Sequence, residues 1–225
     1  MSKLYFHEFT KPFYKKLGLD YHSKLVHGQL CKAIVHYCYE NEEIWRPITL
    51  DSSGTFATAF QIEAKPGDAY KSNRLLHTPA LRAYEEFPVV RAKQRPVIVI
   101  SPPREQIGTK DVGGPMRINK KLVTVAPCYS LSDEMGNAKL DASFIQRVDM
   151  LEFEHFMFLP GEPPLDRDSL LRLDSIAHVF HPHIEPTQFA LSDNVWSILS
   201  GQLERLFRAG SGKSYTDIRQ LLMTQ

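Results

Sequence analysis

The run "RPVIVIS" at residues 95–101 constrains the fold of this chain more than any other stretch of the sequence. It is short and rich in β-branched side chains, which favour a strand over a helix. Because it is apolar without alternation, both of its faces must be covered, so it predicts a strand inside a sheet. Pro96 has no N–H to donate, which places it at a strand start or on a sheet edge.

Three further stretches are predicted to be strands: residues 122–127 ("LVTVAP"), 153–160 and 170–180. Irregular loops link them, and few helices intervene. Short strands with such connections favour a small antiparallel barrel over a parallel sheet. The sequence therefore predicts a mainly β fold with flanking helices.

The first quarter of the chain differs in pattern from the rest. In residues 22–41 apolar side chains recur at four-residue steps, at Val26, Leu30, Ile34 and Cys38, which predicts a helix. Residues 45–62 carry β-forming residues around a Ser-Ser-Gly turn and predict a hairpin or two short strands. We therefore expect an N-terminal helical extension over residues 1–64 and a barrel domain over residues 65–225.

The C-terminal part carries two helical patterns. Residues 191–207 begin with Ser192 as an N-cap and place apolar residues at helical spacing, so this helix should pack on the barrel and close the domain. A weaker amphipathic pattern at residues 215–223 predicts one more short helix.

Composition limits the class of protein. The 27 basic and 26 acidic residues leave a net charge of +1, so a nucleic-acid site must be a local patch. No stretch is apolar enough to span a membrane and no signal peptide is recognisable, which gives the expectation of a cytoplasmic protein with no membrane partner. The three cysteines, Cys31, Cys38 and Cys128, are expected to be reduced thiols.

Two polar clusters allow either a functional or a surface interpretation. Four histidines have spacings compatible with metal ligation but lack acidic or cysteine partners in a recognisable pattern, so no metal or cofactor is predicted: His155, His178, His181 and His183. Four charged residues allow a carboxylate site but are interpreted as exposed ion-pair partners: Asp166, Arg167, Asp168 and Arg172.

Arg95 stands at the head of the buried run. A guanidinium whose backbone is fixed by a sheet is suited to bidentate contact with a phosphate. The alternative is an ordinary strand-edge arginine that pairs with a surface carboxylate. Position alone leaves both interpretations open.

The order of motifs in residues 65–207 resembles that of the PemK/MazF-like family of toxin–antitoxin ribonucleases. The motifs are, in sequence, "KPGDAY", "KQRPVIVISP", "VTVAPCYS", "PLDRDSLLRLDSIAHV" and a closing helix that begins "LSD". The resemblance implies a small SH3-like barrel that forms a homodimer and is inhibited by an antitoxin protein. It also implies cleavage of single-stranded RNA without a metal or cofactor, by attack of the ribose 2′-hydroxyl on the adjacent phosphorus.

The resemblance also implies roles for individual residues. Arg95 matches the family's catalytic arginine. The family commonly has a threonine two residues after the proline of the "VxP" strand end, where this chain has Tyr129, followed by Ser130. Either Tyr129 replaces that hydroxyl, as an acid or as a ring that stacks on a base, or Ser130 does.

Three residues just before Arg95 are expected to bind substrate: Arg91, Lys93 and Gln94. With Arg95, the two cations form a local track for phosphates. A solvated loop is the alternative for this segment.

Two other functions remain open. A catalytically degenerate module would bind RNA or a protein partner without cleavage, because Tyr129 blocks or replaces the catalytic position. A poison of DNA gyrase, from the same fold group, would depend on the end of the closing helix, where the sequence carries no clear sign of it.

Overall fold

The chain divides into two compact units, one made of Met1–Val35 with Gln94–Gln225 and the other of His36–Lys93. The computed structural model describes residues 5–37, 43–50, 52, 57–63, 88–103 and 121–224, and for 43–50, 57–63 and 88 it describes only the backbone. The predicted boundary at Ala64 lies outside the described residues, as does the "KPGDAY" motif.

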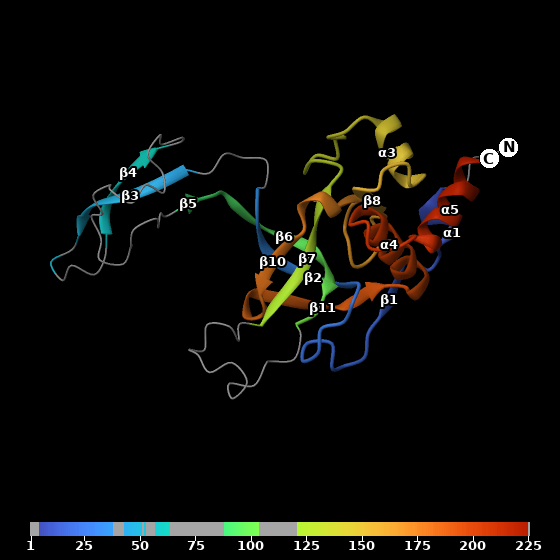
Figure 1. The fold of residues 1–225 in the computed structure, drawn as a ribbon, viewed down its shortest axis with the longest axis horizontal. Helices are drawn as coiled ribbons and strands as arrows, with labels where there is room; N and C mark the ends of the chain where they lie inside the picture. Colours follow the sequence, from blue (N-terminus) through green and yellow to red (C-terminus); the bar gives the residue numbers. More distant parts are fainter. Residues whose placement is uncertain are drawn as a thin grey trace. The chain divides into compact units, whose positions relative to one another are not determined.

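An eight-stranded antiparallel sheet is the framework of the first unit (Figure 1). Its strands are β1 (Tyr14–Lys16), β2 (Gln29–His36), β6 (Ala92–Ser101), β7 (Leu122–Ser130), β8 (Phe156–Leu159), β9 (Ser169–Arg172), β10 (Ala177–Phe180) and β11 (Ile184–Leu191). Their order is β1-β11-β2-β6-β7-β9-β8, and β10 pairs with β7. Among the described strands no pairing joins β1 to β8, so the sheet is not closed into a barrel. The predicted mainly β fold is confirmed.

Four α-helices and two 3₁₀ turns accompany the sheet in the described residues. They are α1 (Phe6–Phe9), α3 (Ala142–Asp149), α4 (Asp193–Leu206), α5 (Lys213–Met223), η2 (Leu173–Ser175) and η3 (His181–His183). The predicted closing helix is confirmed as α4, with Ser192 at its N-cap position, and the predicted short terminal helix is confirmed as α5.

One face of the sheet, which we call the Ile98 face, is covered by helices. Its central apolar cluster joins Ile98 and Leu171 of the sheet to Phe6 of α1, Leu199 of α4 and Tyr215 of α5. The crossing of α4 and α5 is close, because a Cβ at Gly201 would lie 2.5 Å from the hydroxyl oxygen of Ser214. Each large side chain buried here contributes about 1.5–3 kcal/mol to folding.

The opposite face, which we call the Val97 face, carries two separate apolar clusters. The first lies over β2, β6, β7, β10 and β11 and consists mainly of small and β-branched side chains: Cys31, Ala33, Val35, Val97, Val99, Val123, Val125, Val179 and Ile184. The second lies under α3 and joins Val148 of that helix to Phe158 of β8, Leu170 of β9 and Leu131. Arg95 and Tyr129 belong to this face by strand alternation, as do Arg172 and Phe156.

The second unit contains the predicted hairpin. Strand β3 (Glu43–Leu50) pairs in antiparallel fashion with β4 (Ala57–Glu63), and β5 (Pro88–Val89) pairs with the start of β3. Of the predicted Ser-Ser-Gly turn, only Ser52 is among the described residues.

The predicted helix over residues 22–41 is wrong for its described part, residues 22–37, so the helical extension is not confirmed. Residues Gln29–His36 form β2, in which Cys31, Ala33 and Val35 are buried while Lys32, Ile34 and His36 are exposed. Alternate residues of a strand share a face, so the apolar positions can be read with a period of two as well as of four. Gly28, at φ +73°, donates its N–H to the carbonyl of Val99 and fixes the start of this strand beside β6.

The predicted single strand over residues 170–180 is also wrong in part. It consists of β9 and β10, separated by the 3₁₀ turn η2. β10 pairs with residues 122–125 of β7, and β9 pairs with residues 128–130. Pro127 lies where the neighbour of β7 changes, a place where a missing backbone N–H is tolerated. Strands β1 and β11 and helices α1 and α3 were not predicted from the sequence.

No helix within the described ranges combines the length and the apolar character that crossing a membrane requires.

A matched pair of isoleucines tests the strand at residues 29–36. Ile98→Ala should lower the free energy of unfolding by about 2–5 kcal/mol, because Ile98 is fully buried in the core. Ile34→Ala should cost less than about 1 kcal/mol, because the Ile34 side chain is 57% exposed on β2. Urea unfolding followed by circular dichroism measures both. An equal loss at the two positions would favour the helical stripe that the four-residue spacing predicted.

Candidate active site

Arg95 lies on the Val97 face of β6, three residues after the strand begins at Ala92. The antiparallel register of β6 and β7 pairs Val97 with Pro127, which brings Arg95 opposite Tyr129 two residues further along. The guanidinium carbon of Arg95 is 4.3 Å from the centroid of the Tyr129 ring. Both side chains are half-buried, so the ring and the cation stack in a partly desolvated setting.

Arg172 is a second cation at the same ring. It comes from the end of β9, and its guanidinium carbon is 5.6 Å from the Tyr129 ring centroid. Its Nε and one terminal nitrogen donate to the two carboxylate oxygens of Asp174, at 2.9 and 2.6 Å. Its ion-pair partner, Asp174, is not among the four residues predicted to pair at the surface, and the position of Arg172 beside Tyr129 was missed as well. The pairing of β7 with β9 places Arg172 beside Tyr129, and no local sequence pattern predicts how these two strands align.

The Arg172–Asp174 pair sets the charge state of the carboxylate. Partial burial favours the neutral acid and by itself would raise the pKa of Asp174. The hydrogen bonds and the positive charge of Arg172, with the hydroxyl of Ser175, outweigh the burial and hold the pKa of Asp174 below its ordinary value. Asp174 is therefore ionised at neutral pH and fixes the guanidinium plane of Arg172.

This arrangement fits phosphate chemistry. The guanidiniums of Arg95 and Arg172 lie against one aromatic ring, and each can offer parallel N–H donors to phosphate oxygens. Fixed cations of this kind stabilise the additional negative charge of a five-coordinate phosphorus.

Ser130, the other predicted hydroxyl, is not brought to Arg95. Adjacent residues of a strand point to opposite faces, so its side chain lies on the Ile98 face. Its hydroxyl donates to the carbonyl of Ser132 at 2.6 Å. Tyr129 is thus the predicted hydroxyl residue that lies beside Arg95.

Cys128, next to Tyr129, is not a nucleophile at neutral pH. Its side chain is buried in the cluster on the Ile98 face. Burial raises the pKa of the Cys128 thiol far above its usual range, so the thiolate is not populated. Cys128 and Cys31 are free thiols, as predicted, and Cys38 lies outside the described residues.

Of the three residues predicted to bind substrate, Gln94 belongs to the same unit as Arg95. The amide of Gln94 donates to a carboxylate oxygen of Glu185 at 2.9 Å, at an exposed position. Lys93 and Arg91 are exposed and belong to the His36–Lys93 unit, where the Arg91 guanidinium carbon is 5.9 Å from the ring centroid of Tyr37. The phosphate track from these residues stays a prediction.

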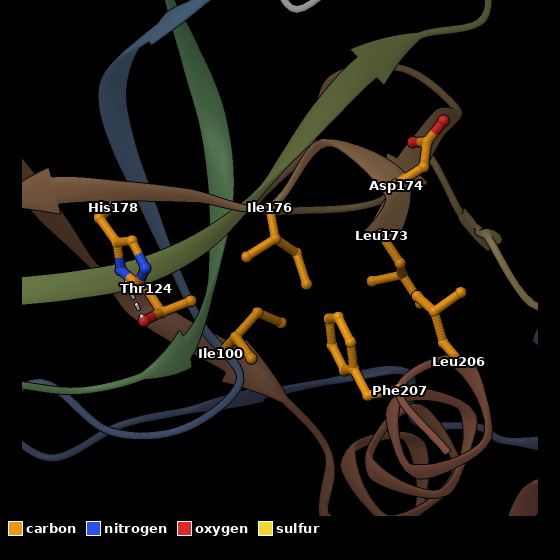
Figure 2. Close-up of a pocket in the computed structure, with 8 residues that line it drawn as sticks. All are labelled: Ile100, Thr124, Leu173, Asp174, Ile176, His178, Leu206 and Phe207. Atoms are coloured by element: carbon orange, nitrogen blue, oxygen red, sulfur yellow. Dashed lines mark hydrogen bonds between the residues drawn. The ribbon is translucent and has the colours of Figure 1, made fainter. Parts of the chain in front are cut away.

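A pocket of about 540 Å³ lies on the Ile98 face, between the sheet and the end of α4 (Figure 2). Most of its lining is apolar: Ile100, Leu173, Ile176, Leu206 and Phe207. At the rim of the pocket, Nδ1 of His178 and Oγ1 of Thr124 form a hydrogen bond of 3.1 Å. Asp174 borders it as well, with its carboxylate directed away from the apolar side chains. The pocket is therefore separate from the Arg95 side chain, and Asp174 connects the two regions.

The histidine cluster shows no metal site in the part of the chain that the structure describes. No group of three or more His, Cys, Asp or Glu side chains there could hold a metal ion. His178 lies on β10, while His181 and His183 lie in η3.

The Arg172–Asp174 pair predicts how stability depends on pH. The pKa of Asp174 is lower in the folded protein than in the unfolded chain, so the pair stabilises the fold fully above the unfolded pKa of about 3.9. This contribution is lost as the pH falls through the folded pKa. Asp174→Asn should therefore lose less stability than the wild type between pH 6 and pH 3, measured by urea unfolding.

Asp166→Asn is the matched control, since it removes the same charge from an exposed loop position. A pH dependence that is equally steep in the wild type and in Asp174→Asn would contradict the role of the pair.

In the comparison with known proteins, the scan against family models matches none of them and the search of curated proteins finds no match. A function for this chain rests on the geometry of Arg95, Tyr129 and Arg172 and on the order of its motifs.

Proposed function

We propose that this chain is a metal-independent endoribonuclease that cleaves single-stranded RNA, as in the PemK/MazF-like family that its motifs resemble. The observation that carries the proposal is the pair of guanidiniums, from Arg95 and Arg172, at the ring of Tyr129. Two cations at a tyrosine ring are suited to this reaction, because the phosphorane gains negative charge and the leaving oxygen needs a proton.

Each group has a defined part in the reaction. The 2′-oxygen of the ribose attacks the adjacent phosphorus and gives up its proton to solvent. Arg95 and Arg172 hold the phosphate oxygens while the bond from phosphorus to the 5′-oxygen breaks. The Tyr129 hydroxyl donates a proton to that oxygen, with the Arg95 guanidinium as the other candidate donor. The products are a 2′,3′-cyclic phosphate and a free 5′-hydroxyl.

The resemblance alone supports the remaining parts of the proposal. We propose that the strands around β6 and β7 correspond to an SH3-like barrel of the family, that two copies of the chain form the active dimer, and that an antitoxin protein restrains it. Residues 65–207, over which the motifs follow the family order, support these three statements.

A second candidate function is binding without cleavage. The guanidinium of Arg95 stacks on the Tyr129 ring at 4.3 Å, and a large ring stands where the family has a small hydroxyl residue. In this alternative the ring takes the place of the catalytic group, and the chain holds RNA or a protein partner without cutting it.

Cleavage of a long RNA in EDTA tests the enzyme. The wild type should produce fragments whose 5′-hydroxyl ends accept phosphate from a polynucleotide kinase without prior dephosphorylation. Arg95→Ala should lower the rate by about 10²-fold or more, the usual loss when one group that stabilises transition-state charge is removed.

Arg208→Ala, at an exposed arginine after α4, is the matched control and should keep the wild-type rate. RNA that stays intact with the wild type, or equal rates for the wild type and Arg95→Ala, would overturn the enzyme proposal.

Two substitutions of Tyr129 separate the two candidate functions. Tyr129→Phe keeps the ring and removes the hydroxyl, so cleavage should fall by about 10²-fold or more if that hydroxyl is the acid. Binding of a 2′-O-methyl oligonucleotide, which cannot be cleaved, should not change. If the wild type is inert and Tyr129→Thr cleaves, the binding module is the correct function.

A further inference from the structure

Guanidiniums and aromatic rings continue from Tyr129 across the Val97 face as one row. We call Arg95, Tyr129, Arg172, Phe156, Phe153 and Arg147 the arginine–aromatic row. The Arg172 guanidinium carbon is 6.0 Å from the ring centroid of Phe156, whose centroid is 6.2 Å from that of Phe153. At the far end the Arg147 guanidinium carbon is 4.7 Å from the Phe153 centroid.

Strand register explains why the row is continuous. Phe156 of β8 pairs directly with Arg172 of β9, so both side chains lie on the Val97 face, as Arg95 and Tyr129 do. The row therefore starts at β6, crosses β7, β9 and β8, and ends on α3, which carries Arg147. Helix α3 lies next to β8 (Figure 1).

Buried contacts hold the two phenylalanines in place. The amide nitrogen of Gln202, a fully buried residue of α4, donates to the carbonyls of Phe153, Glu154 and Phe156 at 2.8–3.1 Å. The rings are half-buried against the cluster under α3. Their positions are thus set before any ligand arrives, which reduces the entropy that binding must overcome.

Two guanidiniums of the row are paired with carboxylates. Glu152 accepts from the Nε of Arg147 at 2.6 Å, and Asp174 accepts from Arg172. Each carboxylate fixes one edge of a planar guanidinium, which has five N–H donors in total. Arg147 and Arg172 are therefore held as ordered ion pairs along the row.

Alternating cations and aromatic rings are suited to one class of ligand. Bases of a single strand stack on aromatic side chains, and the phosphates between them interact with arginines. A duplex keeps its bases stacked on each other, so it cannot use the rings in this way. A purely structural role, in which the row only packs α3 on the sheet, is the alternative that the experiment must exclude.

We infer that the arginine–aromatic row binds the nucleotides on one side of the phosphate held by Arg95, with bases on Phe156 and Phe153 and a phosphate on Arg147. This inference rests on the proposed function for the identity of the ligand as single-stranded RNA. It adds Arg147, Phe153 and Phe156 as residues that position the substrate away from the reacting atoms.

The first test measures binding without chemistry. The probe is a fluorescein-labelled decamer of 2′-O-methyluridine, which lacks the attacking hydroxyl, in fluorescence anisotropy at 50 mM salt. Phe153→Leu keeps an apolar side chain but loses the ring, and should weaken binding by about five-fold to a hundred-fold. Arg147→Ala should weaken binding too. The association constant of this variant should also fall less steeply with salt: the slope of its logarithm against the logarithm of the salt concentration should be smaller in magnitude by about 0.7.

Controls keep the test independent of folding. Arg208→Ala removes an exposed arginine outside the row and should bind the probe as the wild type does. Circular dichroism and urea unfolding show whether each variant is folded. A duplex of the same length should bind the wild type more weakly than the single strand does.

The outcomes distinguish failure of the inference about the row from failure of the proposal that the chain is an endoribonuclease. Cleavage by the wild type together with unchanged binding in Arg147→Ala and Phe153→Leu would overturn the inference and leave the enzyme intact. Weakened binding in both variants without any cleavage by the wild type would support the row and overturn the enzyme. Absence of binding by the wild type would overturn the inference.

A second test uses substrate length. A dinucleotide has a single phosphate between its two nucleosides, which Arg95 would hold, so Arg147→Ala should cleave it as the wild type does. On an RNA decamer, the kcat/KM of the same variant should be lower than that of the wild type. An equal loss on both substrates would point to a structural effect at the reacting atoms and count against the row.

Discussion

Strand β7 is the element on which the rest of the first unit depends. It has neighbours along both edges, β6 on one side and β10 and β9 in turn on the other. Its side chains are apolar on both faces, and they join the helix-covered core on one face to the valine cluster on the other. Because every backbone group in such a strand must find a partner, its register also fixes which residues of β6 and β9 meet at Tyr129.

The sequence predicted three strands of this sheet as they stand, because a short apolar run has few alternatives when it is rich in β-branched residues. β6, β7 and β8 were predicted from such runs, and α4 from its capped amphipathic pattern. β2 was mistaken for a helix because four-residue spacing is also a multiple of two. β11 was missed since its "EPTQ" stretch is polar and contains a proline, while pairing with β1 and β2 stabilises it as a strand.

Two residues of the candidate site, Arg95 and Tyr129, could be predicted from the sequence. Arg95 and Tyr129 followed from the order of the motifs, whereas their direct stacking depends on the register of two strands. Arg172 was assigned to the surface because it lies in a charge-dense segment, and its approach to Tyr129 is a long-range contact. Sequence spacing reports contacts within a turn or a helix, but long-range pairs in a sheet become visible only when the strands are aligned.

The division into two units has a consequence for spectroscopy. The chain has two tryptophans, Trp45 and Trp196, and each unit contains one of them. Trp45 lies on β3 and Trp196 on α4. The intrinsic fluorescence of Trp45→Phe therefore reports on the unit that holds Arg95, and that of Trp196→Phe on the His36–Lys93 unit. Denaturation curves of these two variants would show whether the units lose their structure in one cooperative transition or in two.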